Sequence, residues 1–182
     1  NNQSRVRSMT SSNFHNPPQR TASPAKVVPF PGRVPERLVG VGFRCWLTGF
    51  ESGDVSSWEE DWIAYHSALG LDAAKKVLMN LSHFVRAVKA NTCRNIEVYP
   101  SGCRGFCRDE CLAISVIAAS QHDRRPELRT CTIALTGTED IGDALIGAQR
   151  FAESLRDAQQ ILNTSSICPA NCPLWQPLNK LS

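Results

Sequence analysis

The strongest constraint on the fold is a run of apolar residues at helical spacing in the middle of the chain. Between positions 72 and 88 these residues recur every three or four positions, which places them on one face of a helix. Asp72 stands at the start of the run as a candidate N-cap, and Gly70 separates it from an earlier helical pattern that begins near Ser56. Two helices joined so tightly usually fold back on each other. The apolar face consists of Ala74, Val77, Leu78, Leu81, Phe84, Val85 and Val88.

Three more helices are predicted further along the chain. Residues 109–121 are apolar almost all round, which is typical of a central helix. Pro126 suits the first turn of the next helix and Gly137 its end, and Thr138 is the candidate cap of the last one. Glycines suggest a short packed loop or turn over 39–53, with a helical middle part as an alternative, and residues 96–99 are either a short strand or an extended connector. The prediction is a mostly α domain over 39–162, a compact bundle of about five helices with at most one short strand.

The two ends of the chain differ from this domain. Residues 1–38 contain six prolines, and six basic residues against Glu36 give them a net charge of +5, which leaves −2 for the rest of a chain whose total is +3. Such a segment buries too little apolar surface to order itself, so we expect a disordered basic tail. No secretory signal pattern is present, which favours a cytoplasmic protein with reduced thiols. Residues 163–182 are expected to form an irregular tail with a C-x3-C pair, Cys168 and Cys172.

Cysteines are concentrated between positions 93 and 111. Three of them follow at intervals of four across a glycine-bearing loop and the start of a helix, and a fourth lies ten residues upstream. Thiolates that converge in this way bind zinc or an iron–sulfur cluster, so a metal site is one interpretation of this segment, and buried, unreactive thiols are the alternative. The C-terminal pair is a further candidate for completing the site. The predicted ligands are Cys93, Cys103, Cys107 and Cys111.

Basic residues surround these cysteines. Arg94, Arg104 and Arg108 lie close to a helix start, an arrangement that suits an anion. The same charges would lower a thiol pKa, so a thiol oxidoreductase or other thiolate enzyme using Cys103 or Cys107 is one alternative. The plainer interpretation is a solvated basic face paired with nearby carboxylates.

The leading functional hypothesis is a helical interaction or regulatory module with a protein partner. Nucleotide-binding, serine-hydrolase and zinc-protease motifs are all absent from the sequence, which favours a protein that is not an enzyme. Trp46, Trp58 and Trp62 form either a recognition patch or packing anchors. Nucleic-acid binding through the tail and the basic stretch 86–108 is a second alternative. A membrane partner is not expected, since the longest apolar stretch is far too short to span a bilayer.

Overall fold

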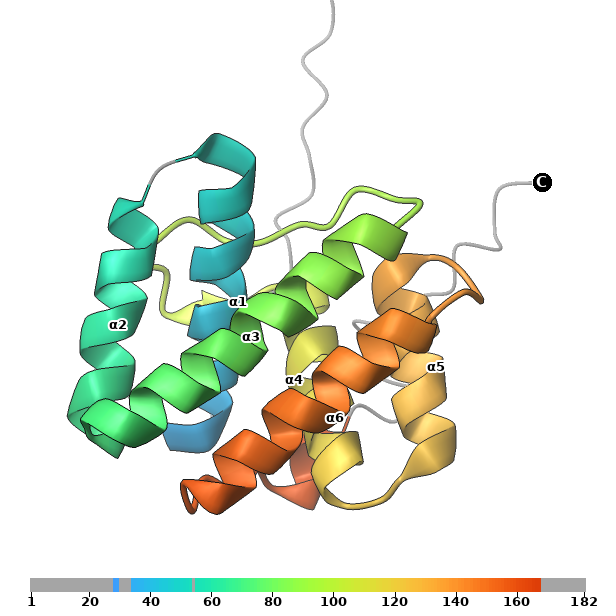
Figure 1. The fold of residues 1–182 in the computed structure, drawn as a ribbon. Coiled ribbons are helices and arrows are strands. Elements are labelled where there is room, and N and C mark those ends of the chain that lie inside the picture. The colour runs from blue at the N-terminus through green and yellow to red at the C-terminus, as the bar shows by residue number, and fades with distance from the viewer. Residues whose placement is uncertain (1–27, 30–33, 54, 168–182) are drawn as a thin grey trace, which may run out of the picture.

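The computed structural model describes residues 28–29, 34–53 and 55–167, and these form a helical bundle (Figure 1). The predicted mostly α fold is confirmed, with six α-helices in these ranges where about five were expected. The helices are α1 (Val34–Ser52), α2 (Ser56–Leu69), α3 (Leu71–Asn91), α4 (Arg108–Gln121), α5 (Arg125–Thr136) and α6 (Gly142–Asp157). A 3₁₀ turn, η1 (Thr164–Ser166), and two strands of two residues each complete the described elements, β1 (Val28–Pro29) and β2 (Gly105–Phe106).

The additional helix is α1, which takes the place of the loop or turn predicted over 39–53, where only the middle part was considered as helical, and it begins inside the range assigned to the tail. Its glycines hide the full length of this helix in the sequence, because they resemble turn residues there but serve close packing in the fold. A Cβ atom at Gly40 would overlap the ring of Phe106, and one at Gly49 would overlap the indole of Trp58. Tertiary contact therefore outweighs the low helix propensity of glycine here. Most of 1–38 and all of 168–182 lie outside the described residues.

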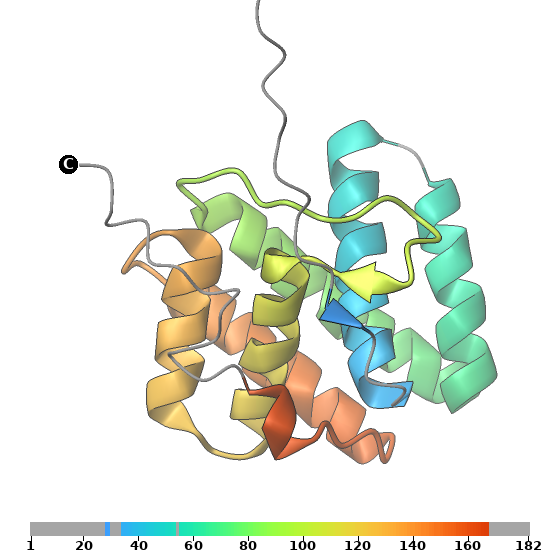
Figure 2. The ribbon, with the colours of Figure 1, turned by 180° about the vertical axis from the view of Figure 1, so that it is seen from behind.

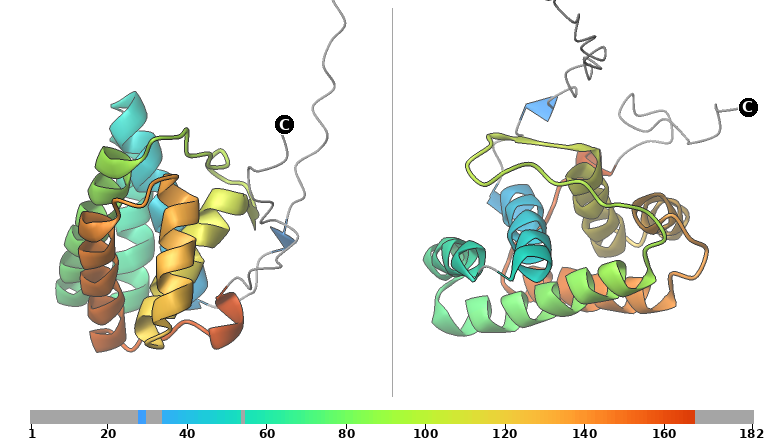
Figure 3. Two further views of the ribbon diagram at one scale, coloured as in Figure 1. Left: turned by 90° about the vertical axis from the view of Figure 1, so that its right-hand side faces the viewer. Right: turned by 90° about the horizontal axis from the view of Figure 1, so that it is seen from above.

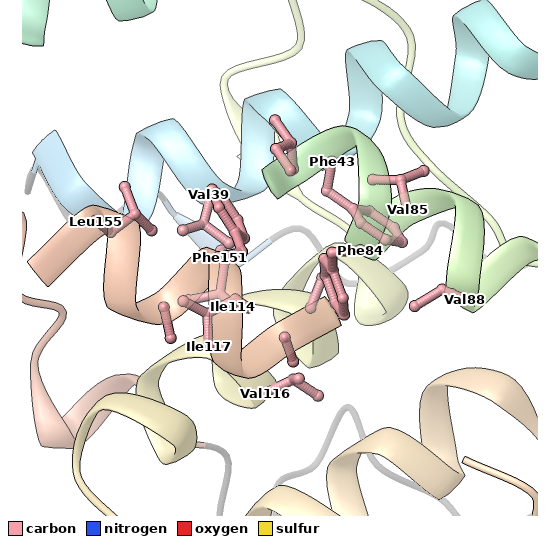
Figure 4. Close-up of a cluster of buried hydrophobic side chains, with 14 of the residues drawn as sticks. Val39, Phe43, Phe84, Val85, Val88, Ile114, Val116, Ile117, Phe151 and Leu155 are labelled. Carbon is pink, nitrogen blue, oxygen red and sulfur yellow. The ribbon is translucent and has the colours of Figure 1, made fainter. Parts of the chain in front are cut away.

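The helices form two layers around one apolar core (Figure 3). α3 and α6 lie side by side in the front layer of Figure 1, and α1, α4 and α5 lie behind them. Phe84 and Phe151 stack between α3 and α6 with ring centroids 6.2 Å apart, and Phe43 reaches the same cluster from α1 (Figure 4). The predicted apolar face of α3 is buried in full, and α4 is buried almost all round, as its composition indicated.

Two connections differ in detail from the predictions. Residues 96–99 have no strand, so the extended-connector alternative holds, and β2 pairs antiparallel with β1 a few residues later (Figure 2). The last helix begins at Gly142 with Ile141 as its N-cap residue, so the predicted cap Thr138 is wrong. Thr138 instead accepts a hydrogen bond from the Asp140 N–H in the preceding turn. Within the described ranges, no helix is long and apolar enough to span a membrane.

Candidate functional site

The segment that carries the predicted cysteine site, residues 92–107, wraps around the N-terminus of α4 and is here called the cysteine loop. Glu110, on the first turn of α4, is fully buried and holds this loop from inside. Its carboxylate accepts hydrogen bonds from the backbone N–H groups of Tyr99 at 3.2 Å and Cys107 at 2.7 Å. It also forms an ion pair with Arg44 of α1, with Nε and Oε1 2.5 Å apart. A buried carboxylate with this many donors fixes the path of the loop.

Arg44 completes this network from the side of α1. Only 3% of its surface is exposed, and its guanidinium donates to the carbonyl oxygens of Cys103 at 3.0 Å and Gly105 at 2.7 Å. The same group lies 5.7 Å from the ring centroid of Phe106. Burial acts to lower the pKa of Arg44, but the hydrogen bond and charge of Glu110 outweigh it and raise that pKa. The guanidinium is therefore a permanent structural cation beneath the loop.

The predicted anion-binding arginines are placed around a carboxylate of the protein itself. Arg94 donates from Nη1 and Nη2 to the two oxygens of Asp109, at 2.9 and 2.6 Å. Arg108 lies 3.6 Å from the same carboxylate, whereas Arg104 is exposed. Asp109 also accepts the backbone N–H of Glu97 at 2.8 Å. For Arg94 and Arg108 the geometry favours pairing with nearby carboxylates, and an external anion stays a prediction.

The four predicted metal ligands differ in exposure, and the thiols of Cys93 and Cys107 have different hydrogen-bond partners. Cys93 is exposed and its thiol donates to the carbonyl oxygen of Gly137 at 2.8 Å, whereas Cys107 is buried and donates to that of Glu97 at 3.0 Å. Cys103 and Cys111 are half-buried. Among the residues that the structure describes, no three His, Cys, Asp or Glu side chains are grouped to hold a metal. Cys168 and Cys172 lie outside those residues, and metal binding stays a prediction.

Cys107 has a structural role at the start of α4. As the N-cap residue it takes part in a capping box, in which its sulfur accepts from the backbone N–H of Glu110 and the Glu110 carboxylate accepts from the Cys107 N–H. Burial, together with the charge of Glu110, raises the pKa of the thiol to about 12. The sequence suggested a lowered pKa from the neighbouring arginines, but burial is the largest effect on this thiol and acts in the opposite direction. A thiol in this state is a poor nucleophile at neutral pH.

A second candidate site lies on the other side of α1, in an apolar hollow of about 510 Å³ between α1, α2 and α3. We call it the aromatic groove. Two of its apolar residues, Val55 and Met79, are more than half exposed, at 56% and 55%. Two charged residues also line the groove, one on α2 and one on α3. The groove is lined by Trp46, Val55, Trp58, Glu59, Trp62, Lys75, Leu78, Met79 and Ser82.

The tryptophans of the groove are both packing anchors and surface residues. Trp46 and Trp58 stack with ring centroids 5.1 Å apart, and Phe50 meets Trp58 edge-on at 5.5 Å. Trp62 stacks on His66 at 5.8 Å. All three indoles are half-buried, so one part of each fixes the helix packing while another part lines the hollow. The ring contacts confirm the tryptophans as packing anchors, and the recognition patch stays a prediction.

Asp61 lies beneath this cluster and was not singled out from the sequence. It is 1% exposed, and its Oδ2 accepts the indole N–H of Trp46 at 2.9 Å. Its Oδ1 has no hydrogen-bond partner in the described part of the chain. Burial raises the pKa of Asp61 to about 8, against the opposing effect of the Trp46 hydrogen bond. The signal available in the sequence was helical phase, because Asp61 stands four residues before the buried Tyr65.

Comparisons with protein-family models, with curated proteins and with solved structures gave no match to this chain.

Proposed function

We propose that the protein is a helical interaction module that binds an amphipathic α-helix of a partner protein in the aromatic groove. The observation that carries this proposal is the exposure of tryptophan and methionine surface around one apolar hollow. Aromatic residues and methionine are enriched at the cores of protein interfaces, where they supply large contact areas. Helix-in-groove recognition uses apolar side chains at intervals of three and four residues, and a groove between helices suits that pattern.

The choice of a helix as the occupant rests on shape and charge. The hollow is open and runs between α2 and α3, so it is suited to a ridge of side chains more than to an enclosed small molecule. Glu59 stands on the α2 side and Lys75 on the α3 side. A partner helix with a basic residue on one flank and an acidic residue on the other complements this arrangement. Met79, an unbranched and flexible side chain, can adapt to the apolar face between those flanks.

The experiment selects helical peptides that bind the full chain from a displayed peptide library. The affinities of the selected peptides are then measured with purified peptides. We expect enriched peptides to carry apolar residues at positions i, i+3, i+4 and i+7, and to change the tryptophan fluorescence on binding. Met79→Glu places a charge in the groove and should weaken binding at least about tenfold. Ile146→Glu is the matched control, because Ile146 is 50% exposed on α6, outside the groove. Failure to enrich any peptide, or equal affinity of Met79→Glu and the parent, would refute the proposal.

A further inference from the structure

A second hollow, of about 550 Å³, lies between the end of α4, α5 and α6, and shares no helix with the aromatic groove. Its volume falls in the range of small-molecule sites. Three arginines line it, Arg125 and Arg129 from α5 and Arg156 from α6. We call it the arginine-lined cavity. Its other charged residues are Asp123 and Glu153, so the lining has three positive and two negative groups and a net charge of +1.

In the described residues, no ion pair joins the arginines of this cavity to its own carboxylates, Asp123 and Glu153. Arg129 pairs through one nitrogen with Glu139, which lies outside the cavity lining, and Arg156 donates through one nitrogen to the carbonyl oxygen of Gln121. A guanidinium carries five N–H donors, so both keep donors for another acceptor. This contrasts with Arg94, whose donors are committed to Asp109 and to backbone carbonyls.

The rest of the lining indicates what such an anion would carry. Leu128 and Leu145 contribute an apolar wall from α5 and α6. The carboxylates of Asp123 and Glu153 accept hydrogen bonds, which suits hydroxyl groups of a ligand. Planar guanidinium groups match the oxygens of a phosphate in a two-point geometry. Phosphate, hydroxyl groups and a ring face thus each meet a complementary part of the lining.

We propose that the arginine-lined cavity binds a small organic phosphate that carries hydroxyl groups and an apolar ring face, the chemistry of a nucleoside monophosphate. The arginines hold the phosphate, Asp123 and Glu153 accept from the sugar hydroxyls, and the leucine wall contacts the ring. This site is independent of the aromatic groove. The two proposals therefore stand or fall separately.

The test is titration of the full chain with adenosine monophosphate, adenosine and inorganic phosphate in separate experiments. Binding is measured by calorimetry and by the chemical-shift changes of backbone amides in NMR spectra. We expect adenosine monophosphate to bind more tightly than either fragment and to shift amides of α5 and α6. Arg125→Gln combined with Arg129→Gln should weaken that binding about a hundredfold, at about tenfold for each lost guanidinium. Both positions are exposed, so the double variant should keep the circular dichroism of the parent.

Arg150→Gln is the matched control, since Arg150 is an exposed arginine of α6 outside the cavity lining, and we expect it to bind like the parent. Three results would overturn the proposal. The first is no binding of adenosine monophosphate up to about 10 mM. The second is an affinity no greater than that of adenosine or of inorganic phosphate. The third is unchanged binding by the double arginine variant.

Discussion

Replacing the buried carboxylate of Asp61 by an amide should remove most of the pH dependence of folding stability between about pH 4 and pH 8. The folded protein holds Asp61 at a pKa of about 8, whereas the unfolded chain has the ordinary value of 3.8. Between these two values the folded state binds more protons than the unfolded state. The free energy of unfolding should therefore fall as pH rises through this window and level off above about pH 8.

The size of the effect follows from the width of the window. Each unit of pKa difference corresponds to about 1.4 kcal/mol, so the shift of Asp61 from 3.8 to about 8 represents about 6 kcal/mol. No reduction for solvent screening applies, because Asp61 is only 1% exposed. A small domain has a total stability of roughly 5–15 kcal/mol, so ionisation of this one buried carboxylate should remove a large part of it. Asp61→Asn keeps an oxygen for the Trp46 indole N–H and carries no charge.

The assay is urea unfolding of the parent and of Asp61→Asn at about pH 5, 7 and 8.5, monitored by tryptophan fluorescence. We expect the stability gained by Asp61→Asn over the parent to be smallest at the lowest pH and to reach several kcal/mol at the highest. Glu60→Gln is the matched control, since Glu60 is an exposed carboxylate beside Asp61 in the same helix. The reasoning fails if the stability of the parent rises with pH over this range, or if Asp61→Asn retains the full dependence.

Three further predictions concern the cysteine loop. Glu110→Gln leaves Arg44 buried without its counter-charge and should lower the free energy of unfolding in urea by about 3–5 kcal/mol. The control Lys76→Ala removes an exposed ion pair with Asp157 and should change stability far less. Equal effects of the two variants would contradict the structural role of Glu110. Alkylation at neutral pH, mapped by mass spectrometry, should label Cys93 before Cys107, because Cys107 is buried and its thiol has a pKa of about 12. Labelling of Cys107 before Cys93 would contradict a buried, protonated Cys107 thiol. Cys103→Ser should lower stability by less than about 1 kcal/mol if hydrogen bonds hold the loop. Bound zinc or iron that is found by elemental analysis and lost in Cys103→Ser would instead establish the metal site.

Sequence reasoning succeeded where local pattern and tertiary environment agree. The apolar face of α3 was predicted residue by residue, since its spacing of three and four has one helical solution. Gly70 and Gly137 end α2 and α5 as expected, because both adopt a positive φ that other residues rarely take. The contacts of the candidate site could be predicted less well from the sequence. Arg94 and Arg108 look available in sequence, and their pairing with Asp109 depends on the path of a loop that the sequence does not reveal.

The main errors converge on α1, and the reason is physical. A helix with internal glycines has low intrinsic stability, so it forms only when its neighbours supply the contacts that those glycines permit. In this chain Gly40 admits Phe106 of the cysteine loop and Gly49 admits Trp58 of the aromatic groove. Arg44 and Trp46, two positions apart, then carry the buried ion pair on one side of α1 and the bond to Asp61 on the other. The helix that local propensity hides is thus the element that supports both the cysteine loop and the aromatic groove, so variants that weaken α1 should disturb the two together.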